Sequence, residues 1–259
     1  MIEFENQPDF PEGAAIVYGG SGGLGQSVCR LLAARGANVV LTYRSRKAEA
    51  DAIVAQITGR GGRALAVHAD MTDPASVRAA AESGLRVFGR LHSVITASGL
   101  VFGTPSLAEC DPVDFRKVVE ADVIGFFNVA QATLPIVREG GGGSYTNLIT
   151  TAVSRTFPGD TLSAVPKAAM AALVKQIVLE EAQYGIRANA VGPGVIFAGM
   201  VLPMLETPAR ALLDEVVEIT PLKRAGTDLE IAEAVVFLAS RRAAYITGQI
   251  IMVDGGLAT

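Results

Sequence analysis

Short apolar runs alternate along this chain with longer segments whose apolar residues recur at helical spacing. Each run is rich in Val, Ile or Ala and is followed by a turn and then a helix-period segment, the pattern of stacked βαβ units. Seven runs are expected to be buried parallel strands: Ala14 to Tyr18, Asn38 to Thr42, Ala64 to His68, Ser93 to Ala97, Tyr145 to Ile149, Arg187 to Val191 and Ile250 to Val253. The pattern predicts one α/β domain over residues 1–259, with a doubly wound, parallel, seven-stranded sheet and helices on both faces.

The segments between the strands carry helix signals. Gln26 to Arg35 and Leu162 to Gln183 have the composition of helices, and the second is dominated by Ala, Met, Leu and Val. Another helix is expected to start at Thr227, whose hydroxyl can cap the first turn while Glu230 reaches back to it. The four glycines Gly140 to Gly143 lie directly before a core strand, so they predict a tight loop within one domain and not a linker between two.

Composition narrows the choice of partners and compartment. The 259 residues are 50% hydrophobic, and 22 basic against 26 acidic residues give a net charge of −4, which does not favour nucleic acid. Cys29 and Cys110 have no metal-ligand spacing and are too few for a disulfide scaffold. Met1 to Glu5 lacks the basic start of a secretory signal, and Gly and Pro interrupt the uncharged stretch Ala188 to Leu205. We therefore expect a cytoplasmic protein without a metal or a membrane span, in which this stretch is an apolar loop region.

A glycine-rich turn follows the first predicted strand. Gly19, Gly23 and Gly25 keep the spacing G-x3-G-x-G before the helix that begins at Gln26. Missing side chains allow the backbone to turn sharply and to approach a pyrophosphate, which the N–H groups at the helix N-terminus can bind. A flexible turn is the alternative, but the position between a strand and a helix favours a dinucleotide site.

The residues after the next two strands bear on the type of dinucleotide. Arg44 stands where an acidic residue would bind the adenosine ribose and repel a 2′-phosphate, so it favours NADP(H). Arg44 and Arg46 could instead be solvated charges that open a helix. Asp70 could accept a hydrogen bond from the adenine amino group, or it could cap a turn.

Together these residues resemble the short-chain dehydrogenase/reductase family over nearly the whole chain. The resemblance is carried by the glycine turn, by Asp70 to Asp73, by Pro193-Gly194 after the sixth strand, and by the segments Ile246 to Gln249 and Val253 to Gly256. It implies a Rossmann-type sheet and a nicotinamide cofactor. It also implies a homotetramer or homodimer built through two long helices, near Asp111 to Arg138 and Leu162 to Gln183.

The family's catalytic set of Asn, Ser, Tyr and Lys is altered in this sequence. Lys167 matches the family lysine, but Ser163 stands at the position of the Tyr and Thr150 at that of the Ser. A Ser hydroxyl is a much weaker acid than a phenol, so Ser163 is expected to donate a hydrogen bond or to fill space. Thr150 keeps a hydroxyl that can donate to a substrate carbonyl or hold its loop.

Asp122 stands at the position of the helix Asn. Peroxisomal-type 2,4-dienoyl-CoA reductases resemble this pattern, because they also lack the Tyr, keep the Lys and carry Asp at this position. The resemblance implies a water-mediated acid. Burial would favour the neutral form of Asp122, and Lys167 its charged form. The alternative is a polar helix residue bound by backbone groups.

The expected site residues form two sets. The catalytic set is Lys167, Asp122, Thr150 and Ser163. The cofactor-binding set is Gly19, Ser21, Gly22, Gly23, Leu24, Gly25, Arg44, Ser45, Asp70, Met71, Ala97, Ser98, Gly99, Lys167, Pro193, Gly194 and Ile196. Two apolar segments are candidates either for a substrate wall or for core packing: Leu100, Val101 and Phe102, and Val195, Ile196, Phe197, Met200, Val201, Leu202, Met204 and Leu205.

The sequence therefore predicts an NADPH-dependent oxidoreductase that reduces a carbonyl or a conjugated enoyl group of an apolar small molecule. Two alternatives remain at this stage. The chain could bind NADP(H) without chemistry, or use the same pocket for a non-redox cyclisation or isomerisation. Tyr18 and Tyr145 lie outside the expected catalytic positions, so they are not expected to replace the missing phenol.

Overall fold

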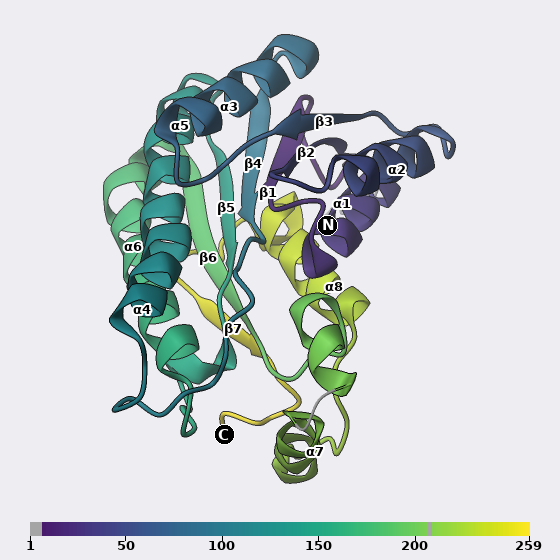
Figure 1. The fold of residues 1–259 in the computed structure, drawn as a ribbon. Helices are drawn as coiled ribbons and strands as arrows, with labels where there is room; N and C mark the ends of the chain where they lie inside the picture. The colour runs from purple at the N-terminus through teal and green to yellow at the C-terminus, as the bar shows by residue number, and fades with distance from the viewer. Residues whose placement is uncertain (1–6, 207–208) are drawn as a thin grey trace, which may run out of the picture.

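A parallel sheet lies between two layers of helices (Figure 1). The computed structural model describes residues 7–206 and 209–259. Helices α3, α5 and α6 cover one face of the sheet and enclose the apolar cluster that contains Ile16 and Phe126. Helices α1, α2 and α8 cover the other face, around Val17 and Leu32. The predicted single α/β domain with helices on both faces is confirmed.

Seven strands pair in the order β3-β2-β1-β4-β5-β6-β7, and every pair is parallel. The strands are β1 (Ala14–Tyr18), β2 (Asn38–Tyr43), β3 (Ala64–His68), β4 (Leu91–Thr96), β5 (Gly143–Leu148), β6 (Ile186–Pro193) and β7 (Ile250–Val253). All seven predicted strands are present. The largest differences are at β4 and β5, which each begin two residues earlier and end one residue earlier than predicted, and at β6, which continues to Pro193.

The helices alternate with the strands as the hydrophobic pattern predicts. They are α1 (Gly23–Ala34), α2 (Lys47–Thr58), α3 (Pro74–Phe88), α4 (Pro112–Val119), α5 (Gly125–Glu139), α6 (Thr161–Glu181), α7 (Ala209–Ile219) and α8 (Asp228–Ala239). The capping box at the start of α8 is confirmed, because Thr227 Oγ1 accepts from Glu230 N–H and the Glu230 carboxylate accepts from Thr227 N–H. Asp73 caps α3 by accepting from Ala75 N–H.

The expectation of one long helix near Asp111 to Arg138 needs correction. A π-helical turn over Glu120–Ile124 separates α4 from α5. Such turns bulge a helix and often occur at functional sites. This one contains Asp122, a buried residue that lines the pocket described below.

The apolar stretch Ala188 to Leu205 is only in part a loop. Its first residues complete β6, and a 3₁₀ segment over Gly199–Glu206 follows the loop. The helical segment Thr161–Tyr184 is long and apolar enough to span a membrane by composition, but 44% of its most apolar window is buried in the molecule. Residues such as Met170 and Val174 of α6 belong to the core.

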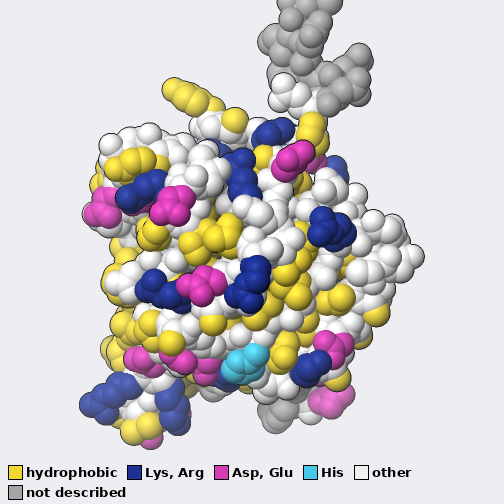
Figure 2. Space-filling model, turned by 90° about the horizontal axis from the view of Figure 1, so that it is seen from above, with side chains coloured by type: hydrophobic (Ala, Val, Ile, Leu, Met, Phe, Trp, Pro, Cys, Tyr) yellow, Lys and Arg dark blue, Asp and Glu magenta, His cyan; other side chains and the backbone are white. Residues whose placement is uncertain are grey.

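On the face seen from above, Figure 2 shows basic and acidic side chains interspersed with hydrophobic ones.

His92 on β4 gives the fold a pH dependence. Its ring is 2% exposed, stacks on Phe10, and contacts Ser93 Oγ through Nδ1 at 2.9 Å. Burial, together with the positive charges of Arg90 and Arg241, lowers the pKa of His92 to about 4. The folded chain therefore keeps this imidazole neutral at pH values where the unfolded chain protonates it.

We expect the free energy of unfolding to fall as the pH decreases from about 6.5 to about 4, because the unfolded state binds more protons in this window. The His92 contribution amounts to up to about 3 kcal/mol. His92→Asn keeps a polar group near Ser93 but does not titrate. Urea unfolding at several pH values should give a shallower pH dependence for this variant, and equal slopes for both proteins would contradict the assignment.

Candidate active site

A cavity of about 460 Å³ opens at the carboxyl ends of the strands. It extends along the loops after β1, β2 and β3, past the loop after β4, to residues from β5, β6 and α6. The strand order reverses beside β1, since β2 and β3 lie on one side of it and β4 on the other. A crevice at this reversal is the usual ligand site of an open parallel sheet.

The glycine turn after β1 can hold an anion against the start of α1. Gly19 adopts φ +79°, and a Cβ atom there would lie 2.8 Å from the Ser98 nitrogen. Gly22 and Gly23 precede and begin α1, so N–H groups at its N-terminus face the cavity side of the turn. Gly25 does not line the cavity. A Cβ atom on Gly25 would lie 2.2 Å from Gly19 O, so this glycine allows α1 to pack on the turn.

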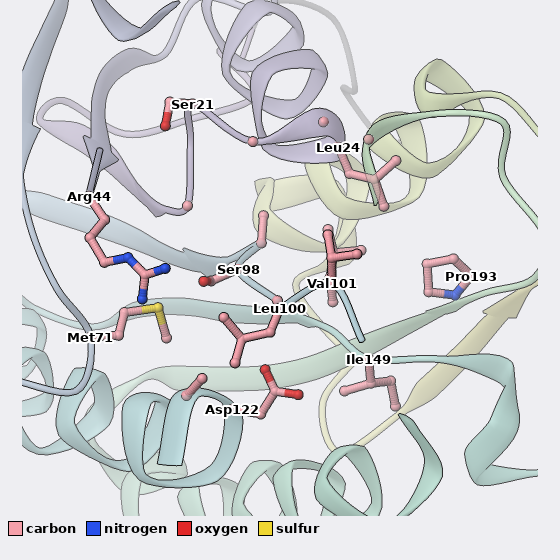
Figure 3. Close-up of a pocket in the computed structure, with 18 of the residues that line it drawn as sticks. Ser21, Leu24, Arg44, Met71, Ser98, Leu100, Val101, Asp122, Ile149 and Pro193 are labelled. Carbon is pink, nitrogen blue, oxygen red and sulfur yellow. The ribbon is translucent and has the colours of Figure 1, made fainter. Parts of the chain in front are cut away.

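Arg44 and Asp70 flank the far end of the cavity. Arg44 extends from the end of β2 over the cavity (Figure 3). Burial alone would raise the pKa of Asp70, but hydrogen bonds from Thr72 N–H and Oγ1–H, with help from Arg44 and His68, hold it below its usual range. Asp70 is therefore an ionised acceptor beside a guanidinium. Its bonds to Thr72 also make it a turn cap, one of the two roles that the sequence left open.

The loop after β4 crosses the middle of the cavity. Ser98, Leu100 and Val101 lie between Arg44 on one side and Ile149 and Pro193 on the other (Figure 3). Val101 is 66% exposed, so this loop also forms part of the cavity mouth. The first of the two candidate substrate walls is thus placed at the cavity, because Leu100, Val101 and Phe102 all line it.

A buried ion pair lines the part of the cavity formed by the π-helical turn and α6. Lys167 Nζ is 3.0 Å from Asp122 Oδ2, and the two residues are 8% and 3% exposed. Asp122 comes from the π-helical turn and Lys167 from α6. Asp122 Oδ2 accepts no well-aligned hydrogen bond among the described groups. A buried acceptor in this state can still bind a hydroxyl or a water in the cavity.

Two hydroxyl groups line the same cavity as this pair. Ser163 is on α6 one turn before Lys167, and both line the cavity, as the helical spacing predicts. Thr150 precedes a 3₁₀ turn after β5 and accepts a hydrogen bond from Ala152 N–H at 3.2 Å. Because the Thr150 oxygen is used as an acceptor, its own hydrogen is available for a ligand. Next to it, Thr151 Oγ1 donates to Asp254 Oδ2 at 2.6 Å and fixes the loop.

The second candidate wall is divided. Ile196 and Val201 line the cavity, whereas Phe197 is 38% exposed and is absent from its lining. Gly199 packs against the glycine turn: its Cα would lie 2.1 Å from a Cβ on Gly23. Val195, Leu202 and Leu205 do not line the cavity, and the side chains of Met200 and Met204 lie outside the described part, as do Met1 to Glu5.

Apart from Gly25, the structure brings every expected site residue to this cavity. Sequence reasoning missed several lining residues: Thr42, Tyr43, Arg46, Ala69, Thr72, Ala121, Leu148, Ile149, Ala198 and Gly199. Most follow the carboxyl end of a strand or neighbour a residue already chosen. A search of the residues that follow each predicted strand would therefore have identified most of them.

Tyr18 and Tyr145 belong to the core and not to the site. Tyr18 Oη donates to Val77 O at 3.0 Å, and Tyr145 Oη pairs with Thr133 Oγ1 at 2.8 Å. Burial raises the pKa of both phenols well above their usual range, with the neighbouring Tyr145 adding to the effect on Tyr18. Both stay neutral and engaged away from the cavity.

Comparison with known proteins identifies the family. The family profile described as Enoyl-(Acyl carrier protein) reductase matches residues 19–258. The chain belongs to the short-chain dehydrogenase/reductase family. The 3-oxoacyl-(acyl-carrier-protein) reductase FabG of Staphylococcus aureus is 32% identical over 244 residues, which cover 94% of this chain and 97% of the relative. The oxidoreductase UcpA of Escherichia coli O157:H7 is 34% identical over 253 residues, covering 93% of each chain.

Solved short-chain dehydrogenase/reductase structures share the fold. A short-chain type dehydrogenase/reductase from Mycobacterium ulcerans superposes with a TM-score of 0.90 at 28% identity, over 96% of this chain and 91% of the other. Levodione reductase gives a TM-score of 0.89 at 30% identity, over 96% and 98%. The family and the Rossmann-type fold expected from the sequence are confirmed, and with them an oxidoreductase of a family that uses a nicotinamide cofactor.

The Asp122–Lys167 pair can be tested through stability. Asp122→Leu leaves a buried ammonium without its counter-ion, and we expect it to cost about 3 kcal/mol of unfolding free energy. Lys167→Met should cost a similar amount, because it leaves the carboxylate alone. The double variant should be less destabilised than the sum of the two by at least about 2 kcal/mol in urea unfolding. Additive losses would mean that the two groups do not interact.

Tyr18→Phe and Tyr145→Phe test the boundary of the site. Tyr18→Phe removes the hydrogen bond from the phenol to Val77 O, so we expect a stability loss of about 1 kcal/mol. Ligand titration should give the wild-type nucleotide affinity for both variants. A loss of turnover in either variant without unfolding would place a phenol in the chemistry.

Proposed function

We propose that this short-chain dehydrogenase/reductase is an NADPH-dependent reductase acting on a carbonyl or a conjugated enoyl group of an apolar small molecule through a non-standard catalytic set. One observation carries the proposal. The buried Asp122–Lys167 pair and the hydroxyls of Thr150 and Ser163 all line the crevice that begins at the glycine turn. The family's usual Tyr is replaced by Ser163.

Several lining residues support the proposal of a dinucleotide bearing a 2′-phosphate. The glycine turn leaves room where a Cβ atom would meet the backbone of neighbouring loops, and helix α1 starts at that point. The guanidinium of Arg44 supplies charge and paired donors for a phosphate. Ser21 and Ser45 line the same region and can add hydroxyl donors. Pro193, Gly194 and Lys167 would hold the nicotinamide half.

Each polar residue at the reactive end has a role that follows from its contacts. A bound reduced nicotinamide supplies the hydride. Thr150 would donate to the substrate oxygen, because its own oxygen already accepts from Ala152 N–H. Lys167 would orient the nucleotide and a water, and Asp122 pairs with it at 3.0 Å. Ser163 is too weak an acid to protonate the product, so we assign proton delivery to water held by Asp122 and Lys167.

The substrate class follows from the lining and from the relatives. Leu100, Val101, Leu148, Ile149 and Val201 surround the polar groups with apolar surface, which suits an acyl or ring substrate. FabG is named for a 3-oxoacyl group and the matching family profile for an enoyl group. These two electrophiles, a ketone and a conjugated enoyl, are the substrates that we propose.

We also propose a homodimer or homotetramer formed through α5 and α6. An apolar surface hollow lies between them, lined by Val123, Ile124, Phe127, Ala169, Ala172, Leu173 and Gln176. Phe127 is 47% exposed and Ile124 39%. A second copy would remove this surface from water. Cytoplasmic location, and the absence of nucleic-acid and membrane partners, belong to the same proposal.

NADPH oxidation with panels of ketones and 2,4-dienoyl thioesters tests the activity. We expect turnover with members of one panel and loss of at least about 100-fold in kcat for Lys167→Ala. Asp122→Asn should also lower kcat, since an amide cannot relay a proton in the same way. Tight NADPH binding without turnover would indicate a silent binding module. Product formed equally with oxidised or reduced nucleotide would indicate non-redox chemistry.

The preference for NADPH can be measured by binding alone. Arg44→Ala should weaken NADPH about tenfold or more, by removing a charge-assisted contact, and should leave NADH affinity within about twofold. Arg35→Ala is the matched control, because Arg35 is a partly exposed arginine paired with Glu233 and does not line the cavity. Equal weakening of both nucleotides by Arg44→Ala would contradict a 2′-phosphate contact.

A further inference from the structure

Asn128 on α5 makes an unusual contact for a buried amide. It is 5% exposed, and its Nδ2 donates to the backbone oxygen of Met71 at 2.9 Å across 57 residues of sequence. Asn128 itself does not line the cavity, but Met71 does, and Figure 3 places the Met71 side chain on the Arg44 side. The amide therefore lies behind the cavity wall on the side of Arg44.

The turn that includes Met71 is shaped locally by its own residues. Thr72 donates through N–H and Oγ1 to Asp70 Oδ1, and Asp70 N–H donates to Ser76 Oγ at 3.0 Å. These contacts join residues within six positions of one another, so they fix the shape of the turn. They do not fix its distance from the opposite side of the cavity.

The position of the turn depends on two elements: Ala69 N–H donates to Tyr43 O at the end of β2 at 2.9 Å, and α5 packs against Met71. A Cβ atom on Gly125 would lie 3.2 Å from Met71 Cβ, so the first turn of α5 is in direct contact with Met71. Three residues later, Asn128 binds the Met71 carbonyl. The same helical run holds Asp122 in the π-helical turn before Gly125. The π-helical turn and α5 after it thus support two parts of the crevice, through Asp122 in the turn and Asn128 in α5.

The geometry points to Asn128 as a positioning residue for the adenosine half of the nucleotide, an inference that rests on the proposed NADPH site. Asn128 ties Met71 to α5, and this bond adds to the one from Ala69 N–H to Tyr43 O in holding the turn where the adenosine half would bind. Loss of its donor would let the turn move away and would leave the Met71 carbonyl buried without a partner. Substitution of Asn128 should weaken binding of the adenosine half of the nucleotide and leave binding of the nicotinamide half unchanged.

Two variants and a matched control separate this role from simple destabilisation. Asn128→Asp keeps the shape of the side chain but replaces the donor with an oxygen, and Asn128→Ser removes most of the amide as a second, uncharged variant. Asn189→Asp is the control. Asn189 is also fully buried, and its Nδ2 donates to Ile246 O at the same 2.9 Å across 57 residues, but it does not line the cavity or contact Met71.

Calorimetric titration of the full-length variants with adenosine 2′,5′-bisphosphate and with reduced nicotinamide mononucleotide tests the inference. We expect both Asn128 variants to bind the adenosine fragment at least about tenfold more weakly, with the mononucleotide within about twofold of wild type. Their KM for NADPH should rise while kcat at saturation is kept. Asn189→Asp should change neither affinity by more than about twofold, whatever its effect on thermal stability.

Three results would overturn the positioning role. The adenosine fragment could bind both Asn128 variants as tightly as wild type, both fragments could weaken equally, or Asn189→Asp could reproduce the selective loss. A wild-type protein that does not bind NADPH at all would overturn the proposed function and this inference with it. Wild-type binding of NADPH combined with any of the three results would leave the proposed function standing and remove only the role of Asn128.

Discussion

The reversal of strand order beside β1 is the constraint on which the site depends. Because β2 and β4 both pair with β1, the loops that follow these strands leave the sheet in opposite directions and open a crevice between them. The crevice is narrow at the glycine turn, where side chains on Gly19 or Gly23 would collide with neighbouring backbone. Everything else in the site is arranged along the two sides of this opening.

The buried ion pair is the second determinant of the chemistry. Removing two charges from water is costly unless they compensate each other, and the 3.0 Å contact between Lys167 and Asp122 provides that compensation. Because the two charges compensate each other, the pair adds polar atoms to this end of the cavity without adding net charge. The π-helical turn that brings Asp122 inward therefore has a chemical consequence, because a regular helix would place this carboxylate differently.

The strands were predictable because their physics is local. β1 is buried at every residue. In a chain where strands alternate with helices, a short apolar run that ends at a glycine is most stable as a buried parallel strand. The glycine turn, Arg44 and Asp70 could be placed for the same reason, since each directly follows a strand. The four-residue spacing of Ser163 and Lys167 on a helix correctly predicted that both face the same cavity.

Other features depend on contacts that the sequence does not state. The π-helical turn at Glu120–Ile124 leaves no distinct pattern of apolar positions, so one continuous helix was expected there. Asn128 resembles any polar residue on a helix until Met71, 57 residues away, is placed against it. Such long-range contacts are decided by the assembled tertiary structure.

A crystal structure of the protein with NADPH tests the central claim most directly. The account predicts the nicotinamide ring beside Lys167 and Asp122, the pyrophosphate at the glycine turn, and the 2′-phosphate on Arg44. A crevice that stays empty at saturating NADPH, or a nucleotide bound with its nicotinamide away from Lys167 and Asp122, would contradict it.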